Sequence, residues 1–350
     1  MTASTTTPPL SLDDPDVGER YLRLVGDGDE YGAVGIVTAL LAHGVPPARV
    51  ILDLIARTQR RVGELWAAND WSIAREHAAT AIGERALAAV AARTPVRPVR
   101  GRITVACVDG EWHAVPSRIL GELLRLDGWR VDFLGANVPG PHLVTHLHQT
   151  GPDAVALSCM LATRLPRAHA AITACRSVGV PVIAGGPGFG PEGRWAHRLG
   201  ADAWAAGAEG AVRRLAGDWP PPIDDPYETG FLGDDEYTHL VRHRGDLVGT
   251  TVTRLTAAYP PVGGYSRRQH DATVEDLGHV IDFLAAALYV ADGQVFTDFV
   301  AWTAAVLQAR QVPPVALQIG LTLIRDQLRD YPSATAMIDA GVAVLREEKR

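Results

Sequence analysis

The sequence predicts three consecutive folding units: an N-terminal four-helix bundle, a doubly wound parallel α/β domain of the Rossmann or flavodoxin type, and a C-terminal all-α domain. Three observations lead to this prediction. Apolar residues recur every three or four positions over residues 15–95, as in amphipathic helices. Short apolar runs then alternate with helical patterns over residues 100–217, and purely helical spacing returns over residues 236–350.

The bundle is predicted from four helical segments that short Gly or Asn-Asp turns separate, as in antiparallel helices. They are VGERYLRLVGDG, EYGAVGIVTALLAHG, PARVILDLIARTQRRVGELWAAND and WSIAREHAATAIGERALAAVAAR. Pro47 suits the first turn of a helix, because a proline there loses no hydrogen bond. Residues 1–14 are polar and rich in Pro and Thr, so we expect them to form a disordered tail.

The α/β domain is predicted from five apolar runs, each followed by a helical pattern except the last. The runs are RITVACV, WRVDFLG, DAVALSC, VPVIAGG and ADAWAAG. Ligands of such sheets bind at the carboxyl ends of the strands. His113, Ser158 and the pair Gly185 and Gly186 all follow strand ends.

Composition narrows the class of protein. The 350 residues are 47% hydrophobic with a net charge of −7, so a nucleic-acid partner is not expected. The start lacks the basic and apolar regions of a signal peptide, and no apolar run reaches the roughly 20 residues of a membrane span. Cys107, Cys159 and Cys175 fit neither a disulfide framework nor a zinc site, and we expect reduced thiols in a cytoplasmic protein.

The stretch CVDGEWHAVPSRIL places His113 after a strand, with Glu111 two residues before it. A histidine alone is more often a loop or capping residue than a ligand. A carboxylate at this spacing, however, can accept one ring N–H of a metal-bound imidazole and fix its tautomer. Glycines at a neighbouring strand end allow a bulky ligand to approach the backbone. A plain flavodoxin-like domain is the alternative.

Glu111 and His113, with Ser158 and then Gly185-Gly186, resemble the D-x-H-x-x-G, S-x-L and G-G motifs of cobalamin-binding domains in the base-off/His-on mode. The resemblance implies that His113 is the lower ligand of cobalt, that Glu111 orients it, and that the other three residues line the slot for the nucleotide tail. The chain departs from the motif at three positions: Glu111 replaces Asp, Pro116 replaces Gly and Met160 replaces Leu.

A second motif lies in LWAANDWSIAREHAAT, where Glu76 and His77 follow Trp66 at a W-x9-E-H spacing. Taken alone, these residues are typical of core packing and a surface turn. The spacing resembles the helical cap of CarH-like cobalamin photoreceptors, which implies that Trp66, Glu76 and His77 border an upper 5′-deoxyadenosyl ligand. Ala67 stands where those repressors have a cobalt-capturing His. With the bundle beginning near residue 15, we expect no winged-helix DNA-binding domain.

After a Pro-, Asp- and Gly-rich linker at 218–235, residues 236–350 have a globin-like helix pattern. The whole arrangement resembles the photocobilins, which implies a bilin such as biliverdin beside adenosylcobalamin. Residues 259–279 are predicted to contain an irregular loop at Pro260-Pro261 and Gly263-Gly264, beside the start of a helix that carries His279, and this stretch offers bilin contacts. The candidates are Tyr259, Tyr265, Arg267, Arg268, His270 and His279, with Asp271 beside them. Because no Cys follows Cys175, any bilin there would be non-covalent.

The resulting expectation is a light sensor rather than an enzyme, with no catalytic residue. We expect a homo-oligomer that signals to an unidentified effector protein without membrane contact. Two alternatives remain. One is a corrinoid protein that carries methyl groups for a methyltransferase. The other is a haem-globin sensor with a degenerate cobalamin domain, for which His279 is the candidate axial ligand.

Overall fold

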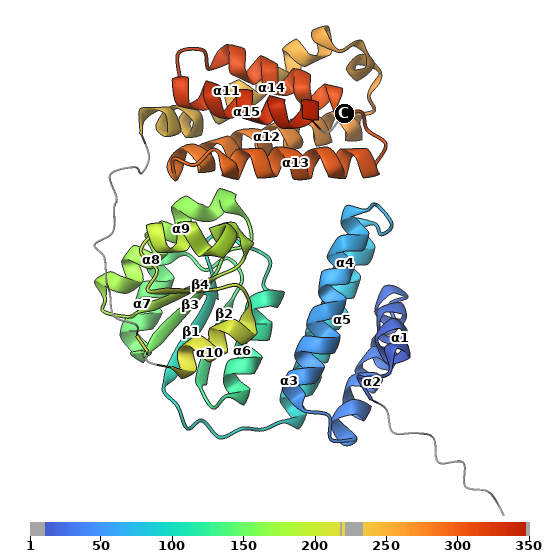
Figure 1. Ribbon diagram of the computed structural model, residues 1–350, viewed down its shortest axis with the longest axis vertical. Coiled ribbons are helices and arrows are strands. Elements are labelled where there is room, and N and C mark those ends of the chain that lie inside the picture. Colours follow the sequence, from blue (N-terminus) through green and yellow to red (C-terminus); the bar gives the residue numbers. More distant parts are fainter. Residues whose placement is uncertain (1–10, 218, 221–233, 348–350) are drawn as a thin grey trace, which may run out of the picture.

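The structure is a computed structural model that describes residues 11–217, 219–220 and 234–347. The first ten residues of the predicted tail and most of the predicted linker at 218–235 lie outside the described residues. The described part forms three bodies: a helical bundle, an α/β domain and a C-terminal helical domain that lies across the other two (Figure 1).

Capping side chains begin three of the bundle's helices, and a proline, Pro47, begins the remaining one. The side chains of Asp14, Asp29 and Ser72 accept hydrogen bonds from backbone N–H groups of the following helix, as N-caps do. The helices are α1 (Pro15–Gly26), α2 (Glu30–Ala42), the run of α3 (Pro47–Arg49), π-helical η1 (Val50–Ala56) and α4 (Arg57–Ala67), and α5 (Ile73–Arg93). Their apolar faces meet in one buried core, in which Leu40 and Ile51 are fully buried.

The α/β domain contains a five-stranded sheet whose strand order is β2-β1-β3-β4-β5, with every neighbouring pair parallel. The strands are β1 (Arg102–Cys107), β2 (Arg130–Gly135), β3 (Ala154–Ser158), β4 (Val182–Gly185) and β5 (Ala203–Ala205). The helices are α6 (Val115–Leu126), α7 (Gly140–Thr150), α8 (Leu165–Ser177), α9 (Arg194–Arg198) and α10 (Ala208–Ala216), with short 3-10 turns η2 (Ala162–Arg164), η3 (Pro187–Phe189) and η4 (Pro191–Gly193). The predicted parallel α/β fold is confirmed.

The α/β domain contacts the other two bodies through different surfaces. At one surface, Val115, Ile119 and Leu123 of α6 belong to the buried core of the bundle. At another, the core around α7, α8 and α9 continues without a break into the C-terminal domain. The α/β domain is therefore the body to which the bundle and the C-terminal domain are both attached (Figure 1).

The C-terminal domain consists of helices packed around a shared apolar core that includes Leu284 and Phe296. They are α11 (Asp235–Ala258), the 3-10 turn η5 (Pro260–Gly264), α12 (Arg267–Tyr289), α13 (Gln294–Ala309), α14 (Val315–Gln327) and α15 (Pro332–Glu347). Two side-chain contacts at the interface connect this domain to the α/β domain. Trp195 Nε1 donates to Asp292 at 3.0 Å, and His169 Nδ1 lies 2.7 Å from the Tyr289 hydroxyl.

The irregular loop predicted within 259–279 is shorter than expected, and the next helix begins earlier. The helix α12 begins at Arg267, because the Ser266 side chain accepts from the Gln269 N–H while the Gln269 side chain accepts from the Ser266 N–H. This reciprocal capping box starts a helix through the charged stretch. The predicted linker is one residue too long as well, since Asp234 caps α11, which begins at Asp235.

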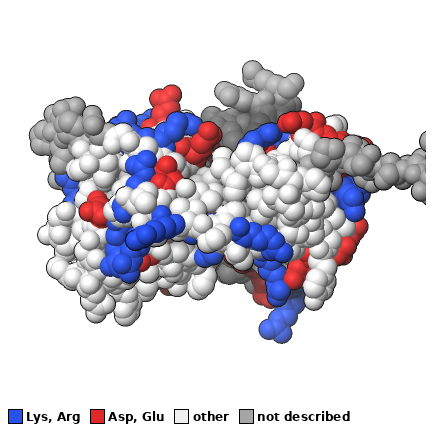
Figure 2. Space-filling model, turned by 90° about the horizontal axis from the view of Figure 1, so that it is seen from below, with Lys and Arg blue, Asp and Glu red and all other residues white. Residues whose placement is uncertain are grey.

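Among the described residues, no helix is both long and apolar enough to cross a membrane. On the face shown in Figure 2, basic and acidic side chains are interspersed across broad uncharged areas. The charge of the chain is thus not segregated into a single-sign patch on that face.

Replacing the core residue Phe296 with Ala should lower the free energy of unfolding by about 3–5 kcal/mol, because a fully buried ring is lost and leaves a cavity. The matched control is Val241→Ala on the surface of α11. This substitution should change the free energy of unfolding by less than about 0.5 kcal/mol. Denaturant unfolding followed by circular dichroism measures both. Equal effects of the two substitutions would contradict the described C-terminal core.

Candidate functional site

The carboxyl end of the sheet presents His113 next to a buried carboxylate. The strand β1 ends at Cys107, and the turn that follows carries Glu111 and His113 before α6 begins. Glu111 is fully buried, whereas the His113 side chain is 56% exposed. A buried carboxylate requires hydrogen-bond donors around it.

Four hydrogen bonds satisfy the Glu111 carboxylate. Its Oε1 accepts from the His113 backbone N–H at 2.9 Å and lies 2.6 Å from His113 Nδ1. Its Oε2 accepts from the N–H groups of Met160 and Leu161, at 2.8 and 3.2 Å. The carboxylate therefore joins the loops after β1 and β3, and it engages Nδ1 so that the exposed imidazole is left with Nε2 for a ligand.

This pair shifts both pKa values. The hydrogen bond to Glu111 raises the pKa of His113 above its usual value, although burial opposes the rise. Burial alone would raise the pKa of Glu111, but hydrogen bonds from His113 and from the Met160 N–H hold it below its usual value. While Glu111 is ionised, the raised pKa of His113 means that the pair contributes its full stabilisation below pH about 6.5, and that this stabilisation is lost as pH rises through the folded-state pKa of His113. Metal ligation needs the neutral imidazole, so binding of a metal by His113 strengthens as pH rises.

Two residues that the sequence interpretation missed support this loop. The Asn137 side chain accepts from the Gly110 N–H at 2.8 Å, and its own N–H donates to the Glu111 carbonyl at 2.7 Å. Asn137 has a φ of +51°, which asparagine tolerates better than most residues. The sequence signal that could have identified Asn137 is an Asn two residues after the end of a strand. Arg164 lies beside Gly110, and its positive charge acts on His113.

The other predicted residues of the α/β domain lie at the same sheet edge. Ser158 is buried and pairs in register with Cys107 of β1 and Gly185 of β4. Gly186 has a φ of +102°, and a Cβ on it would lie 2.3 Å from the Cys159 carbonyl oxygen. Only glycine fits this close approach of the loops after β3 and β4.

The bundle places its three predicted residues at one end of α4 and α5. Trp66 lies in the last turn of α4, and Glu76 in the first turn of α5. Glu76 pairs with the exposed ring of His77 and accepts from the Thr80 hydroxyl at 2.9 Å. The negative charge of Glu76 contributes to the raised pKa of His113, so this end of the bundle faces the histidine.

A cavity of about 620 Å³ lies between the loops after β3 and β4 and the helices α12 and α13. Among the predicted bilin residues, His279 lines it. The other five lie toward the opposite end of α12 or before it: Tyr259 and Tyr265 pack partly buried against the core, while Arg267, Arg268 and His270 are exposed. The structure therefore does not bring the six together. Sequence interpretation missed the cavity because its walls come from two domains.

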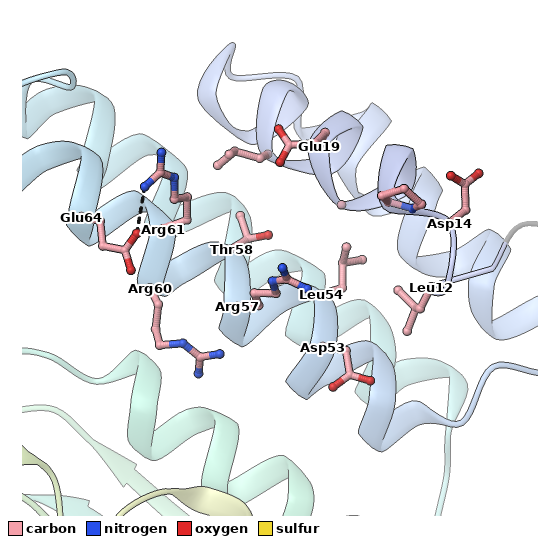
Figure 3. Close-up of a pocket in the computed structure, with 13 residues that line it drawn as sticks. Leu12, Asp14, Glu19, Asp53, Leu54, Arg57, Thr58, Arg60, Arg61 and Glu64 are labelled. Atoms are coloured by element: carbon pink, nitrogen blue, oxygen red, sulfur yellow. Dashed lines mark hydrogen bonds and ion pairs between the residues drawn. The ribbon is translucent and has the colours of Figure 1, made fainter.

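A second cavity, of about 600 Å³, lies within the bundle between α1 and the run of η1 and α4 (Figure 3). Its walls carry Arg57, Arg60 and Arg61 together with acidic residues, and Arg61 pairs with Glu64 at 2.9 Å. None of the predicted site residues lines it.

Comparison with known proteins identifies the class to which this site belongs. Residues 101–216 match the family described as B12 binding domain, and residues 17–91 match a second family of the same description. The chain thus contains B12-binding domains, and the exposed His113 with its Nδ1 held by Glu111 has the donor arrangement that suits an axial ligand of a corrin-bound cobalt. Such a cofactor would need one nitrogen from the chain, because the corrin supplies the equatorial ligands.

The relatives include proteins of two kinds, a transcriptional repressor and corrinoid proteins. The HTH-type transcriptional repressor CarA of Myxococcus xanthus is 37% identical over 121 residues, which is 33% of this chain and 41% of the repressor. A corrinoid protein of Desulfitobacterium hafniense is 28% identical over 118 residues, 32% of this chain and 53% of that protein. The chain thus spans about half the length of these relatives.

The trimethylamine corrinoid protein of Methanosarcina barkeri is 22% identical over 199 residues, 55% of this chain and 91% of that protein. The structure of the Methanosarcina barkeri monomethylamine corrinoid protein superimposes with a TM-score of 0.51 at 17% identity, over 57% of this chain and 97% of that one. This last similarity concerns the fold. The chain is homologous to CarA and to corrinoid proteins, and its B12-binding domains indicate a corrinoid cofactor.

Substituting Glu111 with Gln should lower the pKa of His113 toward about 6.5, because the largest cause of its rise is removed. An NMR titration of the His113 ring in the apoprotein measures this shift. Glu76→Gln is the control and should lower the same pKa less, since its charge acts from a distance. An unchanged His113 pKa in Glu111→Gln would contradict the pairing.

Gly186→Ala should destabilise the protein by about 1–3 kcal/mol, because the substitution combines a left-handed backbone with a Cβ contact of 2.3 Å to a carbonyl. Thermal unfolding measures the loss. The control is Gly249→Ala in α11, where a Cβ meets nothing within 4 Å and should be neutral or slightly stabilising. A Gly186→Ala protein as stable as the parent would show that the loops approach less closely.

Proposed function

We propose that the protein is a light sensor that binds adenosylcobalamin between its bundle and its α/β domain. The observation that carries the proposal is the arrangement of His113, held through Nδ1 by Glu111, opposite the bundle end with Trp66 and Glu76. His113 would hold cobalt from below, and the bundle residues with His77 would border the upper adenosyl ligand. Ser158, Gly185 and Gly186 would line the slot for the nucleotide tail.

Adenosylcobalamin supplies a cobalt–carbon bond that visible light can break. The chain's own part is to hold the cofactor and to respond when its upper ligand leaves. Because the bundle packs on α6, which directly follows the His113 loop, a change at the upper face can move the bundle against the α/β domain. No catalytic residue is assigned; the signal would pass through an interface, in a cytoplasmic homo-oligomer, to an effector protein.

The proposal includes biliverdin as a second, non-covalent chromophore of the C-terminal, globin-like domain. Its best-supported location is the 620 Å³ cavity rather than the residues around 259–270. Linear tetrapyrroles carry propionates, for which Arg164 is available, and rings, for which Phe283 and Phe299 offer aromatic walls. Burial raises the pKa of Asp298 in this wall, and its carboxyl group is an acceptor for pyrrole N–H groups.

One rival function is a methyl carrier for a corrinoid-dependent methyltransferase. It is favoured by the similarity to the trimethylamine corrinoid protein, of which 91% is covered by an alignment over 199 residues. A methyl carrier should prefer methylcobalamin and should not respond functionally to light. The haem-sensor alternative places an axial ligand at His279 and predicts a Soret band that His279→Ala abolishes.

Adding adenosylcobalamin and biliverdin separately to the apoprotein in the dark, followed by desalting, tests the proposal. We expect a retained cobalamin spectrum that changes under green light and a retained red-absorbing bilin band. Cobalamin without bilin would limit the protein to one chromophore. A cobalamin spectrum that green light leaves unchanged would contradict the light sensor.

His113→Ala should weaken cobalamin binding by at least about 10-fold, since it removes the axial ligand of the cobalt. The measurement is a dark titration followed by absorption, with His197→Ala on the exposed face of α9 as the matched control. Equal affinity and spectra of His113→Ala and the parent protein would overturn the assignment of the ligand.

A further inference from the structure

The C-terminal domain reaches the end of α4 that carries Trp66. Arg310, directly after α13, points its guanidinium nitrogens at the carbonyl oxygens of Trp66 and Ala67, at 3.3 and 3.4 Å. The guanidinium carbon also lies 5.2 Å from the centre of the Trp66 ring. The last carbonyls of a helix have no partner within it, and a cation there is favourable. Arg310 thus caps α4 from another domain.

Trp302, on the same helix α13, lies next to Trp66. The two ring centres are 6.3 Å apart with an angle of 31° between their planes, within the range of favourable aromatic pairs. Trp302 is nevertheless 51% exposed. The exposed half of this large aromatic side chain presents a flat apolar surface beside Trp66.

Trp302 and the His113 loop also share a wall. The cavity that Trp302 lines is bounded by Met160 and Leu161, whose backbone N–H groups hold the Glu111 carboxylate. Trp302 is therefore connected on one side to the bundle residue Trp66 and on the other to the loop that fixes His113. The hydrogen bonds of Tyr289 and Asp292 to the α/β domain hold α12 and α13 in place, and with them Trp302.

We propose that Trp302 and Arg310 complete the pocket for the upper axial ligand of the bound cobalamin. Arg310 fixes the end of α4 and with it Trp66, and Trp302 supplies a second aromatic wall against which the purine of a nucleoside ligand packs. The inference rests on the proposed binding of adenosylcobalamin. It adds a third wall, from the C-terminal domain, to a site otherwise built from the two B12-binding domains.

The role assigned to Trp302 and Arg310 concerns ligand choice rather than cobalamin retention as such. His113 and the nucleotide slot, which neither residue touches, would hold every cobalamin, whereas the upper pocket distinguishes a nucleoside from a methyl or hydroxyl group. Stacking of a base on an aromatic side chain contributes enough binding energy for a change of about 5-fold or more in affinity.

The test is a dark titration of the full-length protein with adenosylcobalamin, methylcobalamin and hydroxocobalamin. Trp302→Ala and Arg310→Gln should each weaken adenosylcobalamin binding by about 5-fold or more while changing hydroxocobalamin binding less than about 2-fold. Trp302→Phe should restore most of the preference for adenosylcobalamin. Arg242→Gln, an exposed residue of α11, is the matched control and should behave as the parent protein.

Two results would overturn this inference while leaving cobalamin binding intact. Equal weakening for all three cobalamins would give Trp302 and Arg310 a purely structural role, and unchanged affinities would remove them from the site. A parent protein that retains hydroxocobalamin but does not prefer adenosylcobalamin would overturn both the inference and the proposed light sensor. Trp302→Ala and Arg310→Gln remove different contacts. If one variant protein misfolds, the other still tests the inference.

Discussion

The buried carboxylate of Glu111 is the interaction on which the site depends. One oxygen engages the backbone and ring of His113, and the other engages two N–H groups of the loop after β3. Because all four contacts use a group with no exposure to solvent, the loops after the neighbouring strands β1 and β3 are joined at one point. The imidazole is thereby oriented before any cofactor arrives, and the cost of burying a charge is offset by donors that are almost all backbone.

The bundle and the C-terminal domain pack on different parts of the α/β domain. The bundle packs on α6, which follows the His113 loop, and the C-terminal domain packs on η2 and α8, which follow β3, so both lie beside the carboxyl edge that presents His113 (Figure 1). This geometry brings α4 and α13 together above the site. A corrin held by His113 would therefore have the bundle and the C-terminal helices as close neighbours.

The sequence was sufficient for features that depend on short-range patterns. Strand and helix order, the position of His113 at a strand end and the pairing with Glu111 all follow from periodicity and a two-residue spacing. It failed at the start of α12, because the prolines and glycines at 260–264 suggested a loop that extends past Arg267, although Ser266 and Gln269 already form a capping signal. The contact of Arg310 with Trp66 joins residues 244 positions apart, and no local pattern reports such a contact.

Electron paramagnetic resonance of the cob(II)alamin-loaded protein, with and without 15N-labelled histidine, tests the axial role of His113 most directly. We predict that the cobalt lines are split into triplets by a 14N-imidazole and into doublets in the labelled protein. Loss of the doublets in His113→Ala would assign them to that residue. Triplets that persist in the labelled protein would show that the cofactor's own base remains on cobalt, which would contradict the site described around Glu111 and His113.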